Sequence, residues 1–235
     1  MSNVSSEHIE LKVSDGTAML AWIARPTDTI PQRGLLVFQE AFGVNAHIRD
    51  VTNRFAALGY AAIAPELFHR TTPPMWEGRY DDLPGAMPHM QAMTEPGLEA
   101  DIHATYDWLK GHSDVGGNIA CIGYCMGGRA SFFANSVVPL KAAVSYYGGN
   151  IPMFLGRVGK LSAPMLFFWG ELDHHISAEQ RGKVTSAMLE AKKEHVDIVF
   201  SNADHGFFCD ERKSYEPKAA RISWDTTRSF LDAHL

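Results

Sequence analysis

The stretch GYCMGG (residues 123–128) stands between an apolar run and a run of small residues. The apolar run NIACIGY (118–124) predicts a buried strand, and the pattern over 127–136 predicts a helix. Glycines on both sides of Cys125 leave room for a strained strand-to-helix turn, which lifts the nucleophile above the edge of a sheet. The helix N-terminus also favours a thiolate at this position. We therefore expect Cys125 to be a nucleophile, whereas Cys121 is typical of a buried structural cysteine.

Composition narrows the class of protein. The 235 residues include 46% hydrophobic and 20% charged residues, which is typical of a globular chain with a large core. The net charge is −6 and no basic block is present, so nucleic-acid binding is disfavoured. No apolar run is long enough for a membrane span, and no signal-peptide pattern is visible at the start. Three cysteines without such a signal favour a cytoplasmic location.

Apolar runs alternate with helical patterns from residue 34 onward, which predicts a single α/β domain over residues 1–235 with a mostly parallel sheet and helices on both faces. Two segments around Ser14-Asp15-Gly16 predict an N-terminal hairpin. The proline-containing residues 68–98 predict an irregular cap or binding loop. Buried strands are expected at 34–40, 60–67, 118–124, 141–148, 163–170 and 195–200, and helices at 46–58, 99–111, 127–136, 178–193 and within 214–235.

An acid and a histidine follow the elbow at matching places in the pattern. Asp173 comes just after the strand at 163–170, and His205 comes just after the strand at 195–200. Nucleophile, acid and histidine in this chain order are typical of α/β-hydrolases, and open α/β sheets place their sites at this edge. The sequence therefore predicts a catalytic triad of Cys125, Asp173 and His205.

Each of these residues has a plainer interpretation. Asp173 could be a turn acid or a helix cap, and His205 before a glycine could be a turn residue. His174 and His175 are typical of solvated loop residues. A zinc site formed by these two histidines and a cysteine has no paired ligand spacing to support it, so we expect no metal.

Four motifs together closely resemble dienelactone hydrolase (carboxymethylenebutenolidase), a cysteine-dependent family of α/β-hydrolases. They are GYCMGG, GELDHHIS, ADHGFFCDER and QEAFGVNAHIRD (39–50), and the resemblance covers nearly the whole chain. It implies an α/β-hydrolase fold and a hydrolase that opens a lactone or enol ester through an acyl-thioester on Cys125. It implies no cofactor.

The resemblance also implies roles for residues near position 40. Glu40 matches a family glutamate that pairs with the resting thiol and helps to generate the thiolate. Its plainer interpretation is a structural acceptor for loop N–H groups. The oxyanion hole is expected from the backbone N–H groups of Met126 and Ala41. A thiol suits this chemistry because, once ionised, it is a strong nucleophile and a good leaving group.

The match breaks where the family binds a substrate carboxylate with two arginines. Cys209 stands where one of them is expected, and Arg212 on the same loop is a candidate substitute. Arg70 and Arg79 are candidates for the second, with Arg79 preferred because Trp76 and Tyr80 flank it. A surface ion pair or a solvated loop residue is the alternative for these arginines.

Three other functions stay open at this stage. A relaxed arginine clamp suits a general carboxylesterase acting on neutral esters. The fold also suits a non-catalytic binding protein. A redox role for Cys125 would need a resolving cysteine, for which Cys209 is the candidate.

Overall fold

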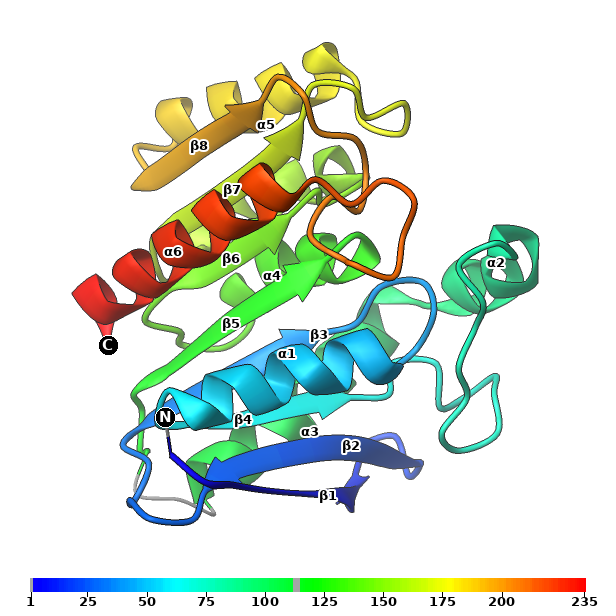
Figure 1. Ribbon diagram of the computed structural model, residues 1–235, viewed down its shortest axis with the longest axis vertical. Coiled ribbons are helices and arrows are strands. Elements are labelled where there is room, and N and C mark those ends of the chain that lie inside the picture. The colour runs from blue at the N-terminus through cyan, green and yellow to red at the C-terminus, as the bar shows by residue number, and fades with distance from the viewer. Residues whose placement is uncertain (1, 112–114) are drawn as a thin grey trace. The chain divides into compact units, whose positions relative to one another are not determined.

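The computed structural model describes residues 2–111 and 115–235, and the chain divides into two compact units (Figure 1). The first extends to Ala120 and the second begins at Cys121. That the two units together form one domain, as expected from the sequence, stays a prediction.

The strands of the first unit pair in the order β1-β2-β4-β3. The predicted hairpin is confirmed: β1 (Val4–Lys12) and β2 (Ala18–Pro26) pair antiparallel around a turn with Gly16 at φ 88°. β4 (Tyr60–Pro65) pairs antiparallel with β2 and parallel with β3 (Arg33–Phe38). β4 and, after Arg33, β3 are buried and lack charged residues, because helices cover the two faces of this sheet.

Helices α1 (Ala46–Ala57) and α3 (Glu95–Gly111) lie on opposite faces of these strands (Figure 1). α1 begins at Asn45, whose side chain accepts a hydrogen bond from the N–H of Ile48 at 3.2 Å. It ends before Gly59, which adopts φ 94°, a conformation that favours glycine. The N-cap thus fixes the start of α1 directly after residues 39–45.

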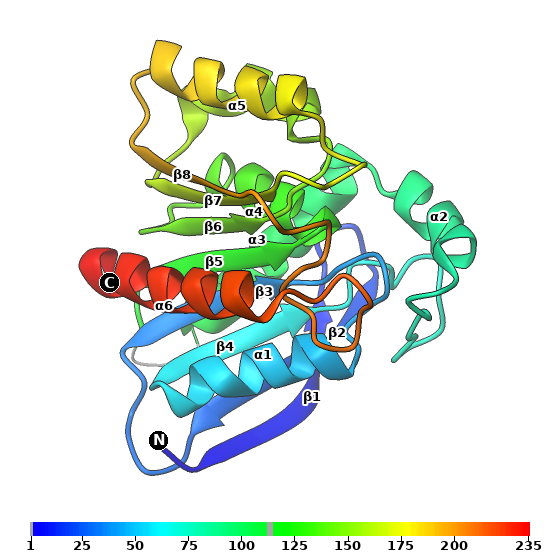
Figure 2. The ribbon, with the colours of Figure 1, turned by 45° about the horizontal axis from the view of Figure 1, so that its top comes forward.

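The segment expected to be an irregular cap is partly helical. α2 (Leu83–Ala92) stands away from the sheet of its unit at the end of a long loop (Figure 2), and α3 begins at Glu95 instead of residue 99. Pro84 stands in the first turn of α2, where its missing N–H costs no hydrogen bond, and Asp82 caps the helix. Prolines there suggested a loop, so the irregular prediction was wrong for these residues.

Four parallel strands form the sheet of the second unit, in the order β5-β6-β7-β8. Figure 1 shows α6 on one face and α4 and α5 on the other. α5 begins with a capping box in which Ser177 and Gln180 exchange hydrogen bonds. The elements are β5 (Ile119–Tyr124, beginning two residues before this unit), α4 (Met126–Asn135), β6 (Ala143–Tyr146), η1 (Ile151–Lys160), β7 (Met165–Gly170), α5 (Ala178–Glu190), β8 (His195–Phe200) and α6 (Pro217–His234).

Two features of this unit differ from expectation. β8 was expected to be buried, but Val196, Asp197 and Val199 are exposed. β8 pairs with β7 alone and stands at an edge of the sheet, so its two faces are only partly covered. The 3₁₀ helix η1 was not expected from the sequence. None of the helices in the described residues is long and apolar enough to cross a bilayer.

Candidate active site

Cys125 occupies a strained turn between β5 and α4. Its backbone adopts φ 56° and ψ −118°, which is a rare conformation for a residue with a side chain. A hydrogen bond from the N–H of Cys125 to the carbonyl of Tyr146 at 3.0 Å holds the turn on the neighbouring strand β6. The side chain is partly exposed, although the residues on both sides of it are buried. The elbow expected from the sequence is present.

Two glycines are required at this turn by close backbone contacts. A Cβ atom on Gly123 would lie 1.9 Å from the carbonyl oxygen of Gly127. A Cβ atom on Gly128 would lie 2.7 Å from the carbonyl oxygen of Tyr146. Both distances are shorter than any real contact of this kind, so only glycine lets α4 start this close to the strands.

The loops after β7 and β8 lie together at the same edge of the sheet. The N–H of Leu172 donates to the carbonyl of Ala203 at 3.0 Å, and the N–H of Glu171 donates to that of Phe200 at 2.9 Å. A Cβ atom on Gly170 would lie 2.4 Å from the Ala203 oxygen. This close packing brings two residues that are distant in the sequence, Asp173 and His205, next to each other.

Asp173 and His205 form a buried hydrogen-bonded pair. Nδ1 of His205 lies 2.7 Å from Oδ2 of Asp173, and the two residues are 8% and 6% exposed. The other oxygen, Oδ1, accepts hydrogen bonds from the N–H groups of His175 and Ile176 at 2.7 and 3.2 Å. Burial acts to raise the pKa of Asp173, but the contacts with His205 and the His175 N–H hold it below its usual value.

Cys125 is the second partner of His205. Nδ1 of His205 is bound to Asp173, so the ring nitrogen left to donate a hydrogen bond to the Cys125 sulfur is Nε2. Burial by itself lowers the pKa of His205, but the Cys125 thiolate and the Asp173 carboxylate raise it to about 10. The two anionic neighbours therefore favour the imidazolium form of His205. That Cys125, Asp173 and His205 act as a catalytic triad stays a prediction.

Tyr147 completes the surroundings of the histidine and was not expected from the sequence. Its ring centroid lies 5.1 Å from that of His205, it is fully buried, and its backbone adopts φ 37°. Tyr147 directly follows β6, at the same sheet edge as Cys125, and that position is the signal that could have indicated it. The His175 ring also meets the His205 ring edge-on, with the ring centroids 5.1 Å apart.

The expected oxyanion donor in this unit stands at the start of α4. Met126 is the first residue of the helix, and the first N–H groups of a helix have no acceptor within it. The carbonyl of Cys125 accepts a hydrogen bond from the N–H of Gly128 at 3.0 Å, which forms the first turn of the helix around Met126. The role of the Met126 N–H as an oxyanion donor stays a prediction.

Arg212 packs against the residue that follows His205. A Cβ atom on Gly206 would lie 2.5 Å from Cζ and from Nη1 of Arg212, and Gly206 has φ 79°. Glycine at 206 therefore makes room for the guanidinium group beside the histidine. Cys209, in contrast, is completely buried and presents no group to solvent.

Glu40 and Ala41 lie in the first unit and are both fully buried. β3 ends at Phe38, so the strand expected over 34–40 is shorter, and Glu40 instead makes an isolated bridge with Gly43. The side chain of Gln39 spans the ends of two strands, because it accepts from the N–H of Leu67 at 3.0 Å and donates to the carbonyl of Glu40 at 3.2 Å. The catalytic roles of Glu40 and Ala41 stay predictions.

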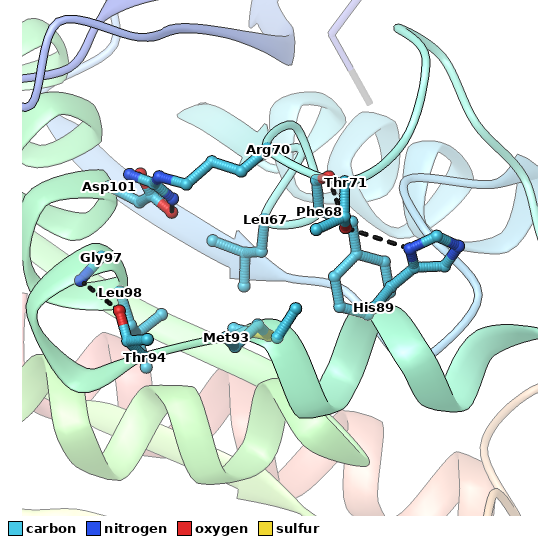
Figure 3. A pocket seen from close by; sticks show the side chains of 11 residues that line it. Leu67, Phe68, Arg70, Thr71, His89, Met93, Thr94, Gly97, Leu98 and Asp101 are labelled. Carbon is cyan, nitrogen blue, oxygen red and sulfur yellow. Dashed lines mark hydrogen bonds and ion pairs between the residues drawn. The ribbon is translucent and has the colours of Figure 1, made fainter.

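Arg79 and Arg70 are engaged within the first unit. Arg79 is exposed and makes a two-point contact with Asp81 at 2.7 and 2.9 Å, which favours the solvated-loop interpretation. Arg70 binds Asp101 through two hydrogen bonds of 2.8 Å beside a small cavity of about 30 Å³ (Figure 3), and it also binds Asp15. We therefore assign Arg70 to the structure of its own unit.

The structure offers no support for the zinc alternative. His174 and His175 are exposed. Among the described residues, no group of metal-ligand atoms close to one another includes either histidine. Both residues fit the solvated-loop interpretation.

The family model of the "Dienelactone hydrolase family" matches residues 19–235. The chain belongs to the dienelactone hydrolase family. Relatives of similar length support this assignment. A protein of Synechocystis sp. named "Putative carboxymethylenebutenolidase" is 30% identical over 224 residues, which covers 91% of each chain. A protein of the same name from Yersinia pestis is 32% identical over 231 residues, which covers 94% of this chain and 86% of its own.

A solved structure extends the likeness to the fold. The crystal structure of a "Putative Dienelactone Hydrolase" from Klebsiella pneumoniae matches with a TM-score of 0.89 and 28% identity, covering 98% of this chain and 99% of its own. The chain therefore has the expected α/β-hydrolase fold. As a member of this family it is a hydrolase that acts on esters, which confirms the enzyme class expected from the sequence.

Proposed function

We propose that this dienelactone hydrolase family member opens a lactone or enol ester with a triad of Cys125, His205 and Asp173. The observation that carries the proposal is the buried His205, which lies between the Asp173 carboxylate at 2.7 Å and the Cys125 sulfur. Once Cys125 is in its thiolate form, its pairing with the imidazolium of His205 lets it attack without a further deprotonation step.

In the acylation step, Sγ of Cys125 attacks the carbonyl carbon of the ester. The oxygen of the tetrahedral intermediate gains negative charge and accepts a hydrogen bond from the Met126 N–H, with Ala41 proposed as the second donor. The carbon–oxygen bond to the leaving group then breaks, and Nε2 of His205 gives its proton to that oxygen. An acyl-thioester and a neutral imidazole result.

In the deacylation step, Nε2 of His205 takes a proton from a water molecule as its oxygen attacks the thioester. The carbon–sulfur bond breaks, the acid product leaves, and the Cys125 thiolate and the His205 imidazolium are restored. Asp173 holds the imidazole in one tautomer through Nδ1 in both steps. We propose that Glu40 pairs with the thiol in the resting enzyme, as the family resemblance implies.

Arg212 is the residue that we propose for binding a substrate carboxylate. It packs against Gly206, directly after His205, which places its guanidinium group beside the proposed triad. Arg79, which is exposed on its loop, is the weaker candidate. The buried Cys209 supports the second candidate function, a general carboxylesterase for neutral esters, because one arm of the family's arginine pair is missing.

The remaining alternatives have less support. Burial raises the pKa of the Cys121 thiol to about 12, so Cys121 is unsuited to a resolving role in redox chemistry. A non-catalytic binding protein would not need the buried contact between Asp173 and His205.

The deciding experiment compares hydrolysis of an activated aryl ester with that of a carboxylated dienelactone. Wild type, Cys125→Ala and the matched control Cys121→Ala, four residues earlier in β5, are tested side by side. We expect Cys125→Ala to lose turnover while Cys121→Ala keeps it. Full activity of Cys125→Ala would refute the mechanism, and turnover of the neutral ester alone would favour the general carboxylesterase.

A further inference from the structure

Arg129 stands one helical turn after Cys125 in α4. Cys125 is the N-cap of this helix, and the N–H of Arg129 reaches the Cys125 carbonyl at 3.4 Å. Residues four apart share a helix face, and helical side chains lean toward the N-terminus. The long side chain of Arg129 is therefore directed back toward the turn that carries the thiol.

The charge of Arg129 is not matched by a carboxylate. Within the described part of the chain, its guanidinium makes no hydrogen bond or ion pair with an acidic side chain, whereas Arg181 in the same unit is bound to Glu171. Arg129 is only partly exposed, and burial lowers the pKa of its guanidinium while the charge of Cys125 acts in the opposite direction. A cation shielded from water is costly unless an anion lies near it.

We propose that Arg129 is a positioning residue for the nucleophile, whose guanidinium holds the Cys125 sulfur in the thiolate form. This inference rests on the proposed function only in that Cys125 is taken to be the nucleophile. The charged groups that face Cys125 in the described part of its own unit include His205, with Asp173 behind it, and Arg129. Glu40 is the further carboxylate that the family resemblance assigns to the thiol.

Arg129 provides a positive charge that persists through the whole catalytic cycle, unlike the charge of His205. His205 loses its proton to the leaving group and regains one from water, so its charge comes and goes. An arginine keeps its charge at every working pH. Arg129 therefore stabilises the thiolate both before attack and when it leaves the thioester during deacylation.

The test is the pH profile of Cys125 alkylation by iodoacetamide, followed by mass spectrometry of the Cys125 peptide. For Arg129→Met we expect the midpoint to move up by about one pH unit or more, as expected when an opposite charge is removed near an ionised group. Alkylation at a pH below the midpoint should then be about tenfold slower. Arg129→Lys should keep most of the wild-type profile because it keeps the charge.

Arg157→Met is the matched control. Arg157 in η1 lies over the ring of Phe133 in α4 at 4.3 Å, so Arg157→Met removes an arginine that packs on the same helix. We expect its profile to match wild type. Overlap of the Arg129→Met and wild-type profiles would overturn the proposal, and so would an equal shift in Arg157→Met. If Arg129→Met does not fold, Arg129→Gln takes its place under the same criteria.

Alkylation needs no ester turnover, so this experiment separates the inference from the proposed function. If Cys125→Ala keeps full esterase activity, the triad mechanism fails. The alkylation profiles then still decide whether Arg129 controls the ionisation of the thiol.

Discussion

Substitution of Gly123 by alanine tests whether close packing at the elbow places the nucleophile. A Cβ atom there would lie 1.9 Å from the oxygen and 2.3 Å from the carbon of the Gly127 carbonyl, whereas ordinary contact begins at 3.4 Å. Both atoms belong to the backbone, so no side-chain rotation relieves the clash. The first turn of α4 has to move by more than about 1 Å, which is overpacking of a rigid core.

The expected cost follows from that displacement. Overpacking of this kind lowers the free energy of unfolding by about 1–3 kcal/mol. For a chain of this size, that corresponds to a fall in Tm of about 2–12 °C. A displacement of about 1 Å at Cys125 and at the Met126 N–H should also lower kcat/KM by about 100-fold.

Thermal unfolding and turnover of an activated aryl ester measure the two effects. The matched control is Gly182→Ala, because Gly182 is exposed in α5 and a Cβ atom there meets no other atom within 4 Å. Alanine is the better helix former, so this control should gain about 0.5–1 kcal/mol and keep full activity. A Gly123→Ala protein with the Tm and kcat/KM of wild type would refute the packing argument.

Three further results are expected. Asp173→Asn should lower kcat on the aryl ester by about 10³–10⁴-fold, because the amide no longer stabilises the imidazolium of His205; a loss smaller than about tenfold would contradict this role. NMR titration should show that His205 stays protonated up to about pH 10 instead of 6.5. The pKa of His205 is raised because the two neighbouring anions stabilise its imidazolium form. The titration midpoint of His205 should therefore fall in Asp173→Asn and in Cys125→Ser. An unchanged midpoint in both variants would count against the ion pair. In native protein at pH 8, iodoacetamide should modify Cys125 and leave Cys121 unmodified, because burial raises the pKa of the Cys121 thiol to about 12; equal labelling would show that β5 opens.

Sequence patterns predicted the elements that carry the site, although not all of their surroundings. Pro84 and Pro88 made the sequence over α2 resemble a loop, because proline in a helix interior is unfavourable. Pro84 is tolerated because it stands in the first turn, a position that only the observed helix start reveals. Val196 and Val199 suggested a buried strand, yet they are exposed because β8 is an edge strand. Apolar residues in a strand favour burial, but a strand is covered only where neighbouring strands and helices pack against it.

The elbow at Cys125 and the positions of Asp173 and His205 directly after two strands could be predicted from the amino-acid sequence. These features depend on local chemistry: the glycines that a strained turn requires and the alternation of strands with helices. Three features emerge from the folded chain alone: the 2.7 Å contact between Asp173 and His205, the packing of Tyr147 against His205, and the pairing of Arg79 with Asp81. Residues 32 positions apart meet because the packing of two loops at Gly170 brings them together, and no local pattern contains that distance.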